Sequence, residues 1–351
     1  MNDFLRDSII YEDMEAIFDA GDYLLLKEKT ILVTGAYGML ASYMVYFLIY
    51  LNEMHGYDIK IISLSRNDEK FKTRFGIYSS KVVQINQSVN ERIDIDCDYI
   101  VHAASFASPQ YYTVCPIDVI LPNVLGTFNL LELAVVKKAR LLFLSTCSVY
   151  GLLGSNKIKI SEDNFGSIDP LDPHSCYDES KRAGETLCVA YHRQKNVSVV
   201  IARIAHTYGP TMDIENDPRV FTSFVKNAVN KENIEIKSDG TAKRSFCYIS
   251  DATIAYFKLL LDGKPGEAYN VCNDDQTVSI KELGELIAKL ANIDFIFKSR
   301  EYSEIYLQDK NADSTVFLSD KLRKLGFSFS IDIKEGFSKV LTHFENEKKE
   351  V

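Results

Sequence analysis

Short apolar runs alternate with longer amphipathic stretches along the first two thirds of the chain. Apolar runs bounded by turn residues predict strands, and apolar residues three or four apart predict helices. The expected strands are 30–34, 59–64, 82–85, 99–103, 141–145 and 197–204, and the expected helices are 38–51, 123–138 and 175–194. This βαβ order predicts an α/β fold with a doubly wound parallel sheet.

The alternation ends after residue 205. There we expect helices over 220–231, 251–261, 280–290 and 333–345 and a short strand over 234–236. No repeat or low-complexity linker separates the two parts, so we expect a smaller α/β substrate lobe interleaved with the first domain. The expected division is a helical extension over 1–28, a Rossmann-type dinucleotide-binding domain mainly over 29–205, and a substrate lobe mainly over 206–351, with 240–262 returning to the first domain.

Two segments near the start of the chain have a strong hydrophobic pattern. Residues 8–18 alternate acidic and apolar residues at helical spacing, which predicts a helix packed outside the sheet. Residues 39–51 read MLASYMVYFLIYL, which is shorter than the roughly 18 residues that span a bilayer. We interpret this stretch as a buried helix and expect no membrane association.

The composition of the chain argues against several classes of function. The chain has 351 residues, 46% of them hydrophobic, and a formal net charge of -9, so it can bury a large core but offers no basic surface for nucleic acid. We therefore expect a small-molecule substrate. Seven cysteines without C-x-x-C spacing, and no basic region before an apolar stretch at the start, favour a reduced cytoplasmic protein with no disulfide and no metal site.

A glycine turn follows the first expected strand, in the run GAYGMLA over residues 35–41. Gly35 permits a tight bend, Gly38 lets the backbone approach a pyrophosphate, and Ala41 is small enough for close packing of helix on strand. Because an apolar strand precedes the turn and an apolar helix follows it, the run predicts a dinucleotide site.

The end of the second expected strand carries no acid for the adenosine ribose. The residues there are Ser63, Leu64, Ser65, Arg66 and Asn67. Arg66 suits a 2′-phosphate, which favours NADP, but it also suits stacking on adenine, which is compatible with NAD, and it also fits a solvated surface cation. The sequence therefore predicts NAD or NADP without choosing between them.

Tyr177 and Lys181 stand four residues apart on an expected helix and so share one face. A neighbouring ammonium lowers the pKa of a phenol from about 10 towards neutrality. The phenolate can then take a proton from a sugar hydroxyl while a nicotinamide takes the hydride.

Several further runs carry a specific resemblance. They are HAASFASP at 102–109, NVLGT at 123–127, FLSTCSVYG at 143–151, SCYDESKR at 175–182, TYGP at 207–210, RV at 219–220 and RSFCYISD at 244–251. Together they resemble the extended short-chain dehydrogenase/reductase family of nucleotide-sugar epimerases, dehydratases and decarboxylases, and most of all its UDP-glucuronate decarboxylase and dTDP-glucose 4,6-dehydratase branch. The likeness covers nearly all of the chain beyond residue 28.

The resemblance implies roles for individual residues. Thr146 is expected to meet the sugar O4, Tyr177 to act as the base, and Lys181 to bind the ribose and lower the pKa of the phenol. The implied cofactor contacts are Gly35, Tyr37, Gly38, Met39, Ser65, Arg66, Ala103, Ala104, Ser105, Tyr177 and Lys181.

The substrate is expected to be a nucleoside-diphosphate sugar. Arg244, followed by Arg219, is our first candidate for the diphosphate, because a guanidinium fork suits two phosphate oxygens. The other expected substrate contacts are Ser108, Tyr112, His206 and Val220. His206 stands where relatives usually have Asn, and a satisfied, half-buried histidine is an equal alternative for it.

The chain departs from the family pattern directly after Thr146. Dehydratases of this branch carry Asp-Glu there and decarboxylases Ser-Glu, whereas this chain carries Cys147-Ser148. Cys147 can in principle act as an acid or base, or it can be an inert buried thiol. Without a carboxylate, the least demanding outcome is a 4-epimerase.

Three alternatives stay open: a UDP-glucuronate decarboxylase or 4,6-dehydratase, an NADP-linked keto-sugar reductase, and a non-catalytic nucleotide-binding protein. From the long helices at 123–138 and 175–194, which resemble those that pair between subunits in this family, we expect a homodimer.

Overall fold

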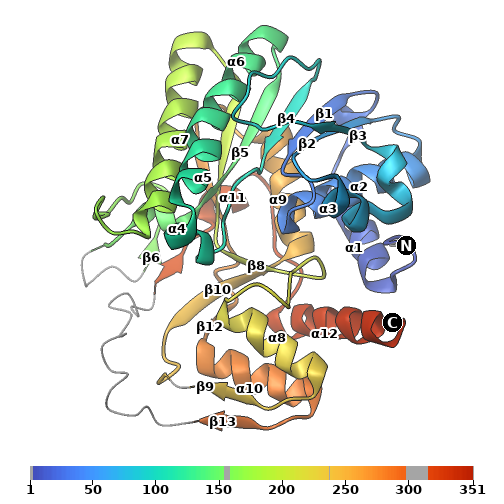
Figure 1. Cartoon of the computed structure of the whole chain (residues 1–351), viewed down its shortest axis with the longest axis vertical. Helices are drawn as coiled ribbons and strands as arrows, with labels where there is room; N and C mark the ends of the chain where they lie inside the picture. Colours follow the sequence, from blue (N-terminus) through green and yellow to red (C-terminus); the bar gives the residue numbers. More distant parts are fainter. Residues whose placement is uncertain (1–2, 154–158, 237, 298–314, 351) are drawn as a thin grey trace.

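A seven-stranded parallel sheet forms the centre of the computed structural model, which describes residues 3–153, 159–236, 238–297 and 315–350 (Figure 1). Its strand order is β11-β7-β5-β4-β1-β2-β3. The strands are β1 (Thr30–Thr34), β2 (Lys60–Ser65), β3 (Val83–Asn86), β4 (Tyr99–His102), β5 (Arg140–Thr146), β7 (Val199–Ile204) and β11 (Ala268–Val271). The winding reverses between β1 and β4, so the expected doubly wound, Rossmann-type sheet is confirmed.

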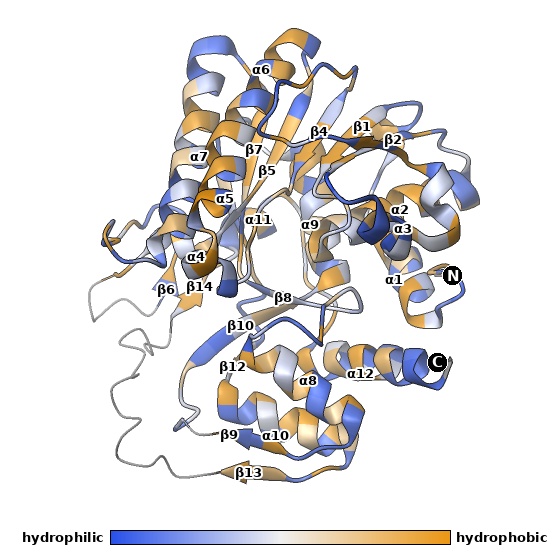
Figure 2. Ribbon diagram, in the orientation of Figure 1, coloured by the Kyte–Doolittle hydropathy of each residue, from blue (hydrophilic) through white to orange (hydrophobic). Residues whose placement is uncertain are grey.

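Helices cover both faces of this sheet. On one face, α6 (Thr127–Lys137) and α7 (Ser175–Lys195) pack against β4, β5 and β7. On the other face, α2 (Met39–His55) and α9 (Ile249–Asp262) pack against β1, β5 and β7. Successive side chains of β1 therefore enter different cores: Leu32 lies in one cluster, and Ile31 and Val33 lie in the other. The apolar colour of these strands in Figure 2 reflects burial on both faces.

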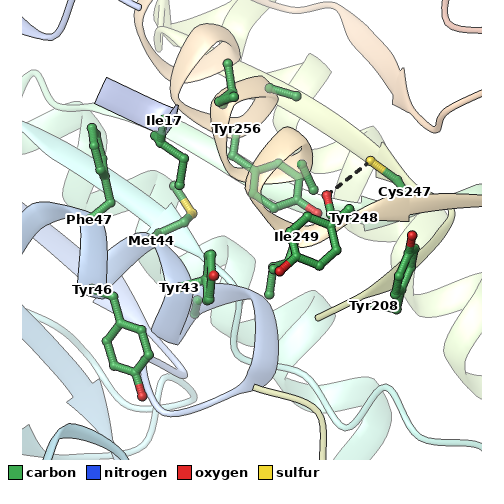
Figure 3. Packing of buried hydrophobic residues seen from close by; sticks show 14 of the residues in the cluster. Ile17, Tyr43, Met44, Tyr46, Phe47, Tyr208, Cys247, Tyr248, Ile249 and Tyr256 are labelled. Carbon is green, nitrogen blue, oxygen red and sulfur yellow. Dashed lines mark hydrogen bonds between the residues drawn. The ribbon is translucent and has the colours of Figure 1, made fainter. Parts of the chain in front are cut away.

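The apolar stretch 39–51 belongs to α2, and every residue from Ala41 to Leu51 is buried. It lies beneath α1 (Ser8–Asp19) and beside α9, which explains a hydrophobic pattern without a polar face. Figure 3 shows Met44 and Phe47 of α2 near Ile17 of α1. The expected buried helix and the expected N-terminal helix are both present.

The helix expected over 123–138 begins earlier. Here α5 (Pro116–Leu121) continues through a π-helical turn over Pro122–Gly126 into α6. The wider turn coincides with Pro122, which has no backbone N–H to donate. The resulting stretch Pro116–Lys137 is the one helix within the described residues that is long and apolar enough to cross a membrane by length and composition, and half of it is buried against the protein. A core helix passes the same test.

The remaining elements form a smaller lobe and several short connections. The C-terminal lobe consists of β8 (His206–Tyr208), β9 (Ile234–Ile236), β10 (Lys243–Tyr248), β12 (Thr277–Ser279), β13 (Phe295–Phe297), α8 (Val220–Asn230), α10 (Ile280–Ala291) and α12 (Ile333–Glu350). The connections are α3 (Asp68–Phe75), α4 (Gln110–Val114), β6 (Lys159–Ile160), β14 (Val316–Phe317), α11 (Asp320–Arg323) and the 3₁₀ turns Leu24–Leu26, Gly76–Lys81 and Cys147–Tyr150.

The two parts are joined through one strand–helix unit. β10 pairs with β8 and β12 in the C-terminal lobe, and α9, which follows it directly, packs against the central sheet. The chain then enters β11 at the edge of that sheet. The carboxyl ends of the central strands therefore face the C-terminal lobe, as Figure 1 shows.

Candidate functional site

A cavity of about 760 Å³ lies between the carboxyl ends of the central strands and the C-terminal lobe. It contains the point between β1 and β4 where the winding reverses, which is where doubly wound sheets bind ligands. Most of the residues expected from the sequence line it: Gly35, Gly38, Met39, Ala103, Ser105, Ser108, Tyr112, Thr146, Cys147, Ser148, Tyr177, Lys181, His206, Arg219 and Arg244.

The glycine turn forms one wall of the cavity. Gly35 has φ +65°, and a Cβ there would lie 2.9 Å from the Cα of Ala104. A Cβ on Gly38 would lie 3.1 Å from the carbonyl oxygen of Gly35. Gly38 caps α2 without a side-chain hydrogen bond, and residues 38–41 line the cavity, so the first turn of this helix is available to an anion there. The turn therefore fits the pyrophosphate of a dinucleotide such as NAD.

A buried histidine fixes the strand ends next to this turn. The hydroxyl of Thr34 lies 2.9 Å from Nδ1 of His102 and accepts the backbone N–H groups of Ala103 and Ala104 at 3.2 and 3.1 Å. Burial lowers the pKa of His102 to about 3, so its ring is neutral. A neutral ring protonated at Nε2 can donate to the Pro122 carbonyl at 3.2 Å and accept from Thr34.

Thr146, Tyr177 and Lys181 come together on the opposite side of the cavity. Thr146 ends β5, and the other two lie one helical turn apart near the start of α7. Nζ of Lys181 donates to the carbonyl oxygen of Leu144 at 2.7 Å and lies 5.9 Å from the centre of the Tyr177 ring. The three side chains expected to form the acid/base group therefore lie together at the cavity.

The electrostatics of this group differ from the expectation that Lys181 lowers the pKa of the phenol. Burial raises the pKa of Tyr177 to about 12, and the groups that oppose this rise are the Thr146 hydroxyl and the charge of Arg219. Burial also lowers the pKa of Lys181 to about 7. The expected influence of Lys181 on the phenol is therefore wrong for this arrangement, because the ammonium is itself destabilised.

Tyr112 and two serines complete the wall beside Tyr177. The Tyr112 ring stacks on the Tyr177 ring at a centroid distance of 5.1 Å and an interplanar angle of 11°, and its hydroxyl donates to the Ala107 carbonyl at 3.0 Å. The hydroxyls of Ser105 and Ser108 are buried and have no hydrogen-bond partner in the described part of the chain. Buried hydroxyls without partners at a cavity are suited to a polar ligand.

Cys147 and Ser148 follow Thr146 in a 3₁₀ turn. Sγ of Cys147 is buried and donates to the Arg203 carbonyl at 3.4 Å. Burial raises the pKa of the thiol well above its usual value, which argues against the acid/base role that we allowed for Cys147. Ser148 is exposed, accepts a hydrogen bond from the Thr146 hydroxyl at 3.2 Å, and carries no carboxylate.

Two arginines and a histidine form the wall contributed by the C-terminal lobe. Arg219 precedes α8, pairs with the Asp217 carboxylate through Nε at 2.8 Å, and lies over the Phe221 ring. Nη1 of Arg244 on β10 donates to the Lys243 carbonyl. His206 on β8 lies near both guanidinium groups, and the wall suits an anion such as a diphosphate.

Five expected residues lie outside the cavity lining: Tyr37, Ser65, Arg66, Ala104 and Val220. Arg66 lies over the Phe106 ring, 5.3 Å from its centre, and Ser65 Oγ is 3.3 Å from Ser63 Oγ. Val220 is 40% exposed. The contact of Arg66 with the Phe106 ring does not distinguish among the three alternatives for Arg66, namely a 2′-phosphate, adenine stacking and a surface cation.

Asp178 is a cavity residue that the sequence reasoning missed. It lines the cavity next to Tyr177, and burial raises the pKa of its carboxyl group to about 6. Its position directly after Tyr177, the expected base, was the feature of the sequence that could have identified it. No group of His, Cys, Asp and Glu residues that could hold a metal ion occurs in the described residues.

The NAD dependent epimerase/dehydratase family model matches residues 31–272 of the chain. Among curated proteins, UDP-glucuronic acid decarboxylase 1 of Xenopus tropicalis is 32% identical over 91% of this chain and 73% of the relative. UDP-glucuronic acid decarboxylase 6 of Arabidopsis thaliana is 33% identical over 87% of this chain and 86% of the relative.

Solved structures share the fold. The UDP-glucose 4-epimerase of Thermotoga maritima superposes with a TM-score of 0.75 at 19% identity, covering 91% of this chain and 99% of that chain. The dTDP-glucose 4,6-dehydratase of Bacillus anthracis, solved with NAD, gives a TM-score of 0.72 at 21% identity, covering 92% of this chain and 98% of that chain.

Proposed function

The chain belongs to the NAD-dependent epimerase/dehydratase family, and from this premise we propose that it oxidises C4 of a nucleoside-diphosphate uronate and decarboxylates the product. One observation carries the oxidation step: Thr146, Tyr177 and Lys181 meet in one cavity with the glycine turn on one side and two arginines on the other. The identity to UDP-glucuronic acid decarboxylases supports decarboxylation as the second step.

Different residues of the cavity would bind the coenzyme and the substrate. The turn at Gly35 and Gly38 would hold the pyrophosphate of NAD, and Lys181 would bind its ribose. When bound, NAD supplies a hydride acceptor. Arg219 and Arg244, in the cavity wall contributed by the C-terminal lobe, hold the substrate diphosphate and so fix the distance of the sugar from Tyr177.

Tyr177 and Thr146 act on the C4 hydroxyl of the sugar. Tyr177 takes the proton of the C4 hydroxyl as hydride leaves C4, and the Thr146 hydroxyl donates to O4 of the sugar. Because burial raises the pKa of Tyr177 to about 12, nearby positive charge has to favour the phenolate before it can act as a base. The charge of Arg219 is the protein group placed for this effect.

The absence of a carboxylate after Thr146 is compatible with decarboxylation. A uronate oxidised at C4 is a β-keto acid. Its carboxylate leaves as carbon dioxide while the electron pair of the C5–C6 bond passes to the C4 carbonyl, a step that needs a hydrogen-bond donor at O4, which Thr146 supplies, but no protein base. The resulting enolate takes a proton at C5, and return of hydride from the reduced coenzyme to C4 would then give the pentose. Elimination of water needs both an acid and a base, and Cys147 and Ser148 supply neither. The relatives and this chemistry together favour the decarboxylase alternative over the 4-epimerase that we expected from the sequence.

The test is product analysis with a panel of sugars. UDP-glucuronate with NAD should yield carbon dioxide and a UDP-pentose, detected by gas release and mass spectrometry, while UDP-glucose and dTDP-glucose should yield no keto product. Tyr177→Phe should lower turnover by about 100-fold or more. Tyr191→Phe, on the same helix but outside the cavity, is the matched control. Formation of an epimer without release of carbon dioxide would refute decarboxylation and favour the 4-epimerase.

We also propose that the protein is a homodimer. The helices α5 and α6 present apolar side chains to solvent, among them Ile117 at 68% exposed, Phe128 at 42% and Val136 at 72%. The Phe128 ring lies 6.3 Å from the Tyr191 ring of α7, measured between ring centres, so this apolar face borders α7. An apolar surface of this kind is typical of a face that a second copy covers.

A further inference from the structure

His206 has a combination of properties that the proposed function does not use. It lines the cavity on β8, and its ring packs at 5.7 Å from the Phe246 ring and 6.3 Å from the Phe221 ring, measured between ring centres. Neither ring nitrogen takes part in a hydrogen bond with any residue that the structure describes. A polar ring held in place by apolar contacts, with its nitrogens free at a cavity, is suited to a polar ligand.

Positive charge surrounds this ring. Arg244 approaches it from β10, and Arg219 approaches it from the turn before α8. Arg219 is paired with the Asp217 carboxylate. Burial, together with the two guanidinium groups, lowers the pKa of His206 to about 3. The imidazole is therefore neutral at pH 7. Burial is the larger cause, and the two guanidinium charges, which a bound anion would counter, add to it.

We propose that His206 couples substrate binding to the uptake of a proton. The proposal rests on the proposed function in one respect, namely that the cavity binds a nucleoside-diphosphate sugar. A diphosphate between Arg219 and Arg244 carries negative charge that counters both guanidinium groups, so it favours the imidazolium, in which both ring nitrogens are donors. By linkage, a ligand that favours the protonated ring binds more tightly as the pH falls.

An Asn at this position would donate a hydrogen bond without titrating. With His206, recognition of the diphosphate varies with pH, whereas an amide would give constant recognition. Two other cavity groups titrate in the same range, since the pKa of Asp178 is about 6 and that of Lys181 is about 7. The experiment has to separate His206 from both.

The test is calorimetric titration of the NAD-loaded protein with UDP-glucose between pH 5.5 and 7.5, in buffers of different ionisation enthalpy. Each phosphate of UDP-glucose is substituted on two oxygens and has lost its one acidic proton well below pH 5.5, so the ligand itself does not titrate in this range. We expect net proton uptake at pH 6 and an affinity that rises about fivefold or more from pH 7.5 to pH 5.5, within the limit of tenfold per pH unit that one proton allows.

His206→Asn should bind UDP-glucose with this pH dependence removed, and Asp178→Asn should retain it. Circular dichroism of each variant checks the fold, and His206→Gln serves as a second non-titrating variant. Binding with equal proton uptake in wild type and His206→Asn, or binding by wild type without proton uptake, would overturn the inference and leave the proposed function intact. If neither UDP-glucose, UDP-glucuronate nor dTDP-glucose binds, the proposed function fails and the inference falls with it.

Discussion

Replacement of Lys181 by methionine should stabilise the protein and abolish its turnover. Lys181 is 3% exposed, and burial lowers its pKa from 10.5 to about 7 even though the charge of Glu185 raises it. The folded protein therefore destabilises the ammonium that the reaction needs. Methionine has a similar length and no charge, so it occupies the same space without that cost.

The magnitude follows from linkage between protonation and folding. A pKa that falls from 10.5 in the unfolded chain to about 7 in the folded protein lowers stability by about 4 kcal/mol at pH 7. Methionine loses the hydrogen bond to the Leu144 carbonyl and the contact of the ammonium with the Phe143 ring, which together offset about 1–2 kcal/mol of the gain. We expect Lys181→Met to raise the free energy of unfolding by about 2–3 kcal/mol at pH 7.

The pH dependence supplies a second signature. Between about pH 7 and pH 10.5 the unfolded chain binds more protons at Lys181 than the folded protein does, so wild-type stability rises with pH in this window. The advantage of the variant should shrink by about 2 kcal/mol between pH 7 and pH 9.

Urea unfolding without added nucleotide, followed by circular dichroism at both pH values, measures the effect. Lys195→Met, at the exposed end of the same helix, should change little. A Lys181→Met variant that is no more stable than wild type at pH 7, or whose advantage is independent of pH, would refute the argument that burial penalises this ammonium.

Three further predictions concern other parts of the molecule. Asp13→Asn should lower the free energy of unfolding by about 3 kcal/mol in urea titrations, because it breaks the buried ion pair with Lys339. The control Asp19→Asn, at an exposed position on the same helix, should have little effect, and equal effects of the two substitutions would contradict this prediction. Cys147→Ser should keep the shape of the pH–rate profile, since the buried thiol stays protonated, and the loss of one limb would show that the thiol titrates in the reaction. Val136→Glu should convert the proposed dimer into a monomer in analytical ultracentrifugation, and a wild-type protein that sediments only as a monomer would contradict the proposed interface.

Local signals in the sequence were sufficient for the central sheet and the glycine turn. An apolar run before Gly35 and an apolar helix after Gly38 specify a strand, a bend and a helix within one short segment, and the structure has these elements there. The four-residue spacing of Tyr177 and Lys181 likewise brought both side chains to one face of α7. Each of these features depends on neighbours close along the chain.

The features that were missed depend on long-range contacts. The pKa of Lys181 follows from burial among elements far apart in sequence, so the spacing to Tyr177 gave the position of the ammonium and not its proton affinity. The thiol of Cys147 is directed at the backbone of Arg203, on a neighbouring strand that no local pattern connects to it. Pro122 was expected inside no element, and the π-helical turn that accommodates it depends on packing against α7.

The carboxylate of Asp13 joins both ends of the chain. It accepts hydrogen bonds from Tyr43 of α2 and Tyr248 at the end of β10, and it pairs with Lys339 of α12 at 2.9 Å. A fragment trimmed to the family match at 31–272 would keep the two phenols but lose both the acid and its cationic partner. The two phenol hydroxyls would then remain in an apolar gap beside the helix that supports the sheet. We therefore expect a version shortened to these boundaries to aggregate on expression, although it keeps every cavity-lining residue except Thr315 and Phe317.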